Sequence, residues 1–497
     1  MKTNLLKWNI KDQEFFSWTF LLIIIGYLLI QLPFLTDMRP ILVDEPVYSS
    51  SVYNFLFKDW YIRTTMGSGG SSNFLLPLLV ALSFKIFGIS LFSARIVAVL
   101  SGMFFLYGLR RLFLYLKIEE KHQLFAFLTV IVTSHFVSLF RYVRPECLSV
   151  TFLLFSVLYF VKYFKEKESK HLVLVAVFLL LSFLSHPFSG VFFALYGLYF
   201  LSDLYRTRKF RLLKYIIIFS LIAILAVIIL FLANVEINKL PLNSLVGRTT
   251  LSQSSVSISD RISVFVNFWF LSNRVIFSIP FILLLIHGLF IKERIALIFS
   301  VFGITYLLVA LVIFGNDRGM TTYIFNYSIL FSVLLIPFSL KALEKLFRSK
   351  YILIIILAVY FTVNLGATVY NNLRKYEKVN SSLEADLKTF IPNDSYVLGP
   401  VEFWFSLPHT FYISYFHLLN LPEETRNKVV YIIVKEKDFF EMKNYGYDLK
   451  DQSLFEVIYS LKDTKSYGNV VLYKKKQSPK SLYLTSDLSN TCFENSL

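Results

Sequence analysis

The first 370 residues of the chain alternate long apolar runs with short basic segments, and this pattern stops beyond residue 370. A helix needs about 20 apolar residues to cross a bilayer. Eleven runs approach that length, and the pattern predicts a transmembrane helix over each. They are 16–35, 92–109, 122–140, 147–164, 171–185, 187–204, 215–233, 275–291, 295–314, 322–340 and 351–370. Residues 1–370 are therefore expected to form an α-helical polytopic membrane domain.

Two further apolar stretches, 73–88 and 262–272, are interpreted as interfacial or re-entrant segments. A full crossing at 73–88 would move every later basic loop to the opposite side of the membrane. Short cytoplasmic loops carry an excess of Lys and Arg, so that arrangement is rejected.

The segment 371–497 mixes polar and apolar residues as a soluble domain does. Strands are predicted at 396–398, 429–434 and 469–473, and helices at 376–390 and 450–461. This alternation indicates a small α/β domain, and about 125 residues suffice to bury a core of their own.

The composition agrees with a membrane protein, because 56% of the residues are hydrophobic and only 17% are charged. An ordinary soluble domain carries about 25% charged residues. A soluble globular fold and a disordered chain are thereby excluded. The chain has two cysteines, Cys147 and Cys492, and they lack the spacing of a zinc site.

The net charge of +17 suggests an acidic partner until it is divided along the chain. Residues 371–497 hold 16 basic and 16 acidic groups, so the whole excess lies in the membrane domain. With the N-terminus inside, the short inner loops contain 22 of that domain's 34 Lys and Arg residues. The charge is thus a topology signal, and no nucleic-acid partner is expected. Eleven crossings predict a multi-pass protein of the plasma (inner) membrane with a cytoplasmic N-terminus and an extracytoplasmic C-terminal domain.

The expected outer side also receives two long loops, 36–91 and 234–274, and loops of such length are often functional. The first contains Asp44 and Glu45, followed by Pro46, which suits the first turn of a helix. The two acids could merely favour that helix terminus. Alternatively, a carboxylate at the membrane surface deprotonates an acceptor hydroxyl or amine. Tyr48 lies one helical turn after Asp44 and could hydrogen-bond in the same site.

The order of short motifs in this loop resembles the first loop of the GT-C glycosyltransferases. It is most similar to the group that contains dolichyl-phosphate-mannose–protein mannosyltransferases and lipid A aminoarabinose transferases. The motifs are Asp44-Glu45-x-x-Tyr48, Asp59-Trp60, Pro77-Leu78, Phe87-Gly88 and Ala94-Arg95, with Arg144-Pro145-Glu146, His186-Pro187 and Asp317-Arg318 later in the chain. One motif departs from the family, in which a charged residue often precedes Pro-Pro-Leu. Here the segment is Asn73 to Leu78, and Arg63 or Lys85 would replace the missing phosphate contact.

The resemblance implies an inverting transfer of a sugar from a polyprenyl-phosphate carrier to a lipid, protein or glycan acceptor outside the cytoplasm. Asp44 would be the base, and Glu45 would assist it by binding acceptor or a divalent metal. A phosphate leaving group requires cations, and arginine matches phosphate with its planar fork. The expected substrate-binding residues are Tyr48, Arg63, Lys85, Arg144, Glu146, His186 and Arg318. Further outer-side arginines are Arg95, Arg141, Arg248 and Arg274.

Two other functions fit the same composition. A transporter or flippase of a lipid-linked saccharide would favour inverted repeats and broken helices, and no clear repeat is present. A membrane scaffold would tolerate substitution of Asp44, Arg144 and Arg318 alike. The chain contains no Gly-rich nucleotide motif or P-loop, which argues against a nucleotide-sugar donor and an ATP-driven transporter.

Overall fold

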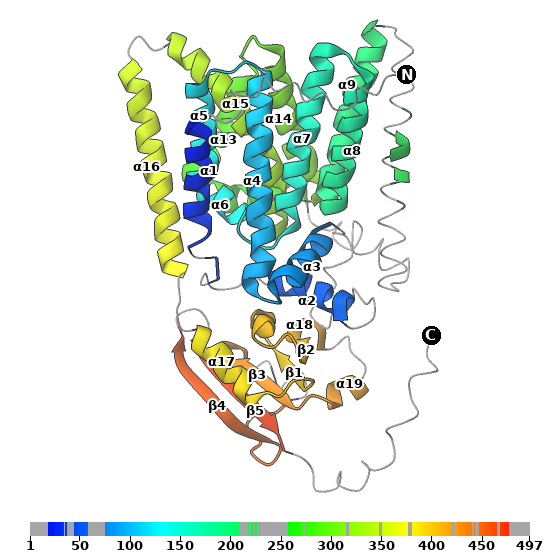
Figure 1. The fold of residues 1–497 in the computed structure, drawn as a ribbon, viewed down its shortest axis with the longest axis vertical. Helices are drawn as coiled ribbons and strands as arrows, with labels where there is room; N and C mark the ends of the chain where they lie inside the picture. Colours follow the sequence, from blue (N-terminus) through cyan, green and yellow to red (C-terminus); the bar gives the residue numbers. More distant parts are fainter. Residues whose placement is uncertain are drawn as a thin grey trace. The chain divides into compact units, whose positions relative to one another are not determined.

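The structure is a computed structural model. It describes residues 18–33, 35–36, 44–57, 75–207, 257–271, 275–314, 318–346, 350–375, 380–418, 423–439, 447–464 and 468–476, with a few isolated positions between them. These residues form two compact units. The first contains α1, the second half of α2 and the helices from α3 to α16 (Figure 1). The second contains the first turns of α2, Asp44–Ser50, and the sheet domain from α17 to β5.

The first unit is helical throughout its described part (Figure 1). Its elements are α1 (Trp18–Gln31), α2 (Asp44–Phe57), α3 (Leu75–Phe87), α4 (Leu91–Tyr115), α5 (Glu120–Val132), α6 (Ser134–Leu139), α7 (Pro145–Glu166), α8 (Ser169–Ser185), η2 (Pro187–Gly190), α9 (Val191–Thr207), α12 (Ile258–Trp269), α13 (Val275–Gly288), α14 (Arg294–Phe314), α15 (Arg318–Leu346) and α16 (Lys350–Lys375).

Four helical segments in the described part are long and apolar enough to cross a membrane: Leu91–Tyr115, Pro145–Glu166, Pro187–Arg206 and Arg294–Val312. The other expected spans are helices that are shorter or less apolar, except 215–233, which lies mostly outside the described residues. The predicted class, a polytopic helical protein with a small C-terminal sheet domain, is confirmed.

The two stretches predicted as interfacial or re-entrant form short helices. α3 has 13 residues and α12 has 12. At 1.5 Å per residue each is about 20 Å long or less, whereas the hydrocarbon core of a bilayer is about 30 Å thick. Ser90 ends the turn after α3 and caps α4 by accepting a hydrogen bond from the Ser93 N–H. This turn holds α3 against the beginning of α4.

The prediction of one continuous helix over 122–140 is wrong. The backbone is extended at Thr133, so the segment divides into α5 and α6. A break in a helix leaves backbone carbonyls without their usual partners. Here the Val132 carbonyl accepts a hydrogen bond from the Thr368 hydroxyl of α16. A contact with a residue 236 positions away along the chain thus compensates for the break. No local sequence pattern predicts this contact.

α4 and α7 pack in parallel near the centre of the first unit. The hydroxyl of Ser101 on α4 lies 3.0 Å from that of Thr151 on α7. About two turns further along α4, Gly108 faces Phe155 on α7. On another side of α4, a Cβ at Gly102 would lie only 2.0 Å from the Tyr27 hydroxyl of α1. Small residues let helices approach closely, and they do so here on two sides of α4.

The second unit contains a five-stranded mixed sheet in the order β2-β1-β3-β5-β4. Strands β2, β1 and β3 are parallel, and β5 pairs antiparallel with both β3 and β4. The elements are α17 (Asn380–Phe390), β1 (Tyr396–Gly399), η5 (Val401–Ser406), β2 (Phe411–Ser414), α18 (Tyr415–Leu418), α19 (Glu423–Asn427), β3 (Tyr431–Lys435), η6 (Glu436–Asp438), β4 (Phe455–Thr464) and β5 (Gly468–Lys475).

The helix predicted at 450–461 is wrong, because β4 occupies most of that range. Asp451 begins a turn: its carboxylate accepts from the Ser453 N–H and its carbonyl from the Phe455 N–H. The chain then pairs with β5 at the edge of the sheet. The tyrosine and β-branched residues of this segment suit a strand better than a helix. Burial and a hydrogen bond to Asp386 raise the pKa of Tyr459, on this strand, to about 12.

Candidate functional site

The acidic pair of the first loop begins α2. Asp44 and Glu45 lie in its first turn together with Pro46, as predicted. Asp44 is half-buried, whereas Glu45 is fully buried, and Tyr48 is buried one turn further along. An exposed cap would leave both carboxylates in water, so the burial of Glu45 is more than capping requires. These residues belong to the second compact unit.

A second charged group lies in the first unit, where α7 begins. Arg144 precedes the helix, Pro145 is its first residue and Glu146 its second. The Arg144 guanidinium lies 3.0 Å from the carboxylate of Glu146, which is completely buried. His186, at the end of α8, is 7% exposed and is close enough for the charge of Arg144 to act on its ring. The structure thus brings together three of the predicted substrate-binding residues.

Hydroxyl groups continue this cluster into the helix bundle. The Tyr327 hydroxyl on α15 donates to Ser149 on α7 at 2.8 Å, and Ser149 bonds in turn to Ser182 on α8. The rings of Tyr327 and His186 are 6.3 Å apart. None of these hydroxyls was predicted as a site residue. The signal that would have found them is a polar side chain within an otherwise apolar span, since buried polar groups need partners.

Two of the outer-side arginines have structural roles instead. Arg95 is fully buried; it donates to the Leu35 carbonyl at 2.7 Å and stacks on the ring of Tyr142. Arg141 is 1% exposed and donates to Gln31 and to Asn372. Buried cations that donate to backbone carbonyls and amides join helices together, so we do not assign phosphate binding to either residue.

The structure says less about the remaining predicted cations, because several of them lie outside its described residues. Lys85 is exposed in the last turn of α3, where a positive charge favours the helix terminus. Arg318 is the first residue of α15, nine residues before Tyr327, and its side chain is not among those described. Arg63, Arg248 and Arg274 lie outside the described residues.

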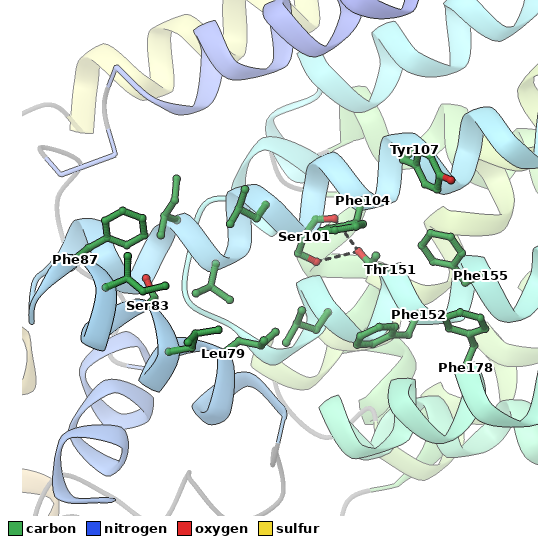
Figure 2. A pocket seen from close by; sticks show the side chains of 16 residues that line it. Leu79, Ser83, Phe87, Ser101, Phe104, Tyr107, Thr151, Phe152, Phe155 and Phe178 are labelled. Atoms are coloured by element: carbon green, nitrogen blue, oxygen red, sulfur yellow. Dashed lines mark hydrogen bonds between the residues drawn. The ribbon is translucent and has the colours of Figure 1, made fainter. Parts of the chain in front are cut away.

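An apolar groove of about 550 Å³ runs between α3, α4, α7 and α8. Figure 2 shows Leu79 and Phe87 of α3 at one part of it and Phe104, Phe155 and Phe178 at another. Among the hydroxyls of the lining, Ser101 and Thr151 bond to each other and to backbone carbonyls, and Ser83 donates to the Ser93 carbonyl. The wall is therefore apolar in effect, as a hydrocarbon chain requires.

The groove approaches the charged cluster along α7. Leu148 and Thr151 line the groove, and Glu146 lies only two residues before Leu148. At 1.5 Å of rise per residue, the end of the groove is within about one helical turn of the buried ion pair along the axis of α7, although Glu146 and Leu148 point to different faces of the helix. An apolar groove and a charged group thus lie at the same level of α7.

One group of metal-ligating side chains occurs in the described part of the chain. The ligand atoms of Glu166, Glu168 and His171 lie within 4.8 Å of one another at the end of α7 remote from Arg144. Ion pairs account for it, since His171 is 2.6 Å from Glu166 and Lys170 is 2.5 Å from Glu168. It has no connection with the predicted site.

Comparison with known proteins defines the class of the fold. Residues 71–233, about a third of the chain, match the family model described as dolichyl-phosphate-mannose-protein mannosyltransferase. Together with the structural likeness that follows, this match confirms the predicted resemblance: the chain has a GT-C membrane glycosyltransferase fold.

Two solved structures that the chain resembles are crystal structures of ArnT from Cupriavidus metallidurans. The apo state matches with a TM-score of 0.62 at 12% identity, over 91% of this chain and 97% of that chain. The structure bound to undecaprenyl phosphate matches with a TM-score of 0.61 at 13% identity, over the same shares of both chains. No curated protein matches the chain.

Proposed function

We propose that the chain is an inverting glycosyltransferase that moves a sugar from a polyprenyl-phosphate carrier to a lipid, protein or glycan acceptor outside the cytoplasm. The observation that carries this proposal is an apolar groove whose end lies at the same level of α7 as a buried Arg–Glu pair. A carrier with a hydrocarbon tail and a phosphate head needs an apolar surface and a cation close to each other. The structural relative bound to undecaprenyl phosphate supports the same class of carrier.

In the proposed reaction the acceptor attacks the anomeric carbon from the face opposite the phosphate. The bond between that carbon and the phosphate oxygen breaks as the new glycosidic bond forms. The carrier phosphate leaves with an additional negative charge, which the Arg144 guanidinium stabilises. Glu146 holds that guanidinium in place from 3.0 Å away. The acceptor proton passes to the carboxylate of Asp44, and Glu45 binds the acceptor beside it.

The base is tested by Asp44→Asn in the purified full-length protein. Mass spectrometry of glycolipids and glycoproteins from cells with and without the gene first identifies the acceptor and the sugar. General-base catalysis contributes about 10²–10⁴-fold, so kcat should fall by about 100-fold or more. Asp260→Asn is the matched control, because Asp260 is also a first-turn helix acid but is exposed.

Full activity of Asp44→Asn with a lowered melting temperature would show that Asp44 only caps α2. Transport of the lipid-linked saccharide by the purified protein, without covalent transfer, would instead support the transporter reading.

The groove is tested by Leu79→Trp, which places an indole in the groove. Overfilling an apolar site costs about 1–3 kcal/mol, so the KM for the carrier-linked donor should rise about tenfold with kcat nearly unchanged. The control is Leu78→Trp on the same helix, since Leu78 is 40% exposed and does not line the groove. Equal KM values for the two variants would rule out the groove as the site of the carrier tail.

A further inference from the structure

A second cavity, of about 370 Å³, lies at the opposite end of the helix bundle from α3. It is formed where α4 and α7 end and where α14 begins, and α15 closes its remaining side. The turn between α4 and α5 contributes Leu116 to Glu119 to its wall. The cavity is thus separate from the groove and from the charged cluster around Arg144, and neither of them explains it.

Positive charge predominates in the wall of this cavity. Four cationic side chains line it, Lys117, Lys165, Arg294 and Lys341, against two carboxylates, Glu119 and Glu293. Both carboxylates form ion pairs with lysines.

Glu293 lies 3.2 Å from Lys341, and Glu119 lies 3.3 Å from Lys121. In the described part of the chain, Lys117, Lys165 and Arg294 have no carboxylate within ion-pair distance. Three exposed cations from three different helix ends therefore converge on one hollow without an internal counter-charge.

Apart from His122, whose ring lies 3.1 Å from the Glu344 carboxylate, the rest of the lining is apolar. Leu116, Ile118 and Phe164 contribute side chains from one side, and Ile295 and Phe338 from the other. These apolar side chains would not stabilise a free inorganic anion, because such an anion gains nothing from apolar contact. A ligand with a charged head joined to a hydrocarbon part satisfies both halves of the wall at once.

We propose that this cavity binds the phosphate head of an anionic membrane phospholipid, with the glycerol and first acyl carbons on its apolar floor. Basic pockets between transmembrane helices are suited to such heads, and Arg294 adds the planar fork that matches a phosphate. In the topology predicted from the basic loops, this end of the bundle faces the cytoplasm, where anionic lipids gather. The lipid would hold the ends of α4, α7 and α14 together, independently of the sugar transfer.

The experiment measures binding of phosphatidylglycerol and of phosphatidylcholine to the full-length protein by native mass spectrometry. The test variant carries Lys117→Gln, Lys165→Gln and Arg294→Gln. The control variant carries Lys170→Gln, Lys292→Gln and Lys345→Gln, which removes the same charge from exposed positions that do not line the cavity. Each basic side chain near an anionic lipid surface is worth about fivefold in affinity.

Phosphatidylglycerol should bind the wild type and the control at least about tenfold more tightly than the test variant. Phosphatidylcholine should not distinguish the three proteins. Equal loss in the test and control variants would reduce the effect to general surface charge and overturn the proposal. Displacement of the lipid by millimolar inorganic phosphate would overturn it as well, in favour of a site for free phosphate. If the triple variant does not fold, the single variants Lys165→Gln and Arg294→Gln should each weaken binding about fivefold, against Lys292→Gln as control.

Discussion

At the scale of single residues, arginine illustrates how burial and partners decide a role. Arg95, Arg141 and Arg144 all lie in or beside apolar helices and carry the same charge. The first two direct their guanidinium groups to backbone carbonyls and amides. Arg144 is paired with a buried carboxylate near a histidine, at the level of α7 where the apolar groove ends. Of these three arginines, Arg144 is therefore the one that we assign to the carrier phosphate.

The Arg144–Glu146 pair leads to a stability prediction. Arg144→Met leaves the buried Glu146 without the guanidinium 3.0 Å away. Breaking a buried ion pair costs about 3–5 kcal/mol, so the melting temperature should fall clearly. The exposed pair Lys428–Glu424 is the control, since Lys428→Met should cost less than about 1 kcal/mol. The double variant Arg144→Met/Glu146→Gln should recover most of the loss; no recovery would contradict the assignment of the pair.

At the scale of elements, the errors of prediction share a cause. The break at Thr133 and the strand at 455–464 both depend on backbone partners outside the segment itself. Thr368 lies 236 residues away, and β5 follows β4 in a hairpin. Apolar periodicity reports which residues are buried, but it does not report where a backbone carbonyl finds its donor. Helices such as α4 and α7 were predicted well because their hydrogen bonds are internal.

Close helix packing at α4 gives the prediction at this scale. Gly102→Ala places a Cβ 2.0 Å from the Tyr27 hydroxyl and 2.8 Å from Phe140. Tyr27 must then move, and its hydrogen bond to the Val99 carbonyl is lost. Overpacking costs about 1–3 kcal/mol, measured as a lower thermal midpoint in detergent. Gly197→Ala has open space around the new Cβ, so it should be neutral or stabilising by up to about 1 kcal/mol. Similar midpoints for the two variants would contradict this packing.

At the scale of the whole molecule, the distribution of charge predicts the orientation in the membrane. The excess of basic residues lies in short loops of the helical unit, and the sheet domain is neutral. The two compact units divide within α2, so that Asp44 belongs with the sheet domain although its helix continues into the helical unit.

A topology reporter tests the orientation directly. An alkaline phosphatase fused after Leu497 should be active, because the enzyme folds only outside the reducing cytoplasm. A fusion within the basic segment 341–350 should be inactive. The opposite pair of results would place the sheet domain and Asp44 in the cytoplasm and would remove the proposed site from the outer face.

The sequence by itself determined the class of the fold, a helical membrane domain with a small sheet domain, and the resemblance to GT-C transferases. Each follows from composition, local periodicity or short ordered motifs, which act over a few residues at a time. Only the tertiary structure decided which cations are structural, which hydroxyls join Glu146 and His186, and where a groove opens along α7. The physical reason is that burial and charge pairing depend on contacts between helices far apart in the chain, and one sequence does not reveal these contacts.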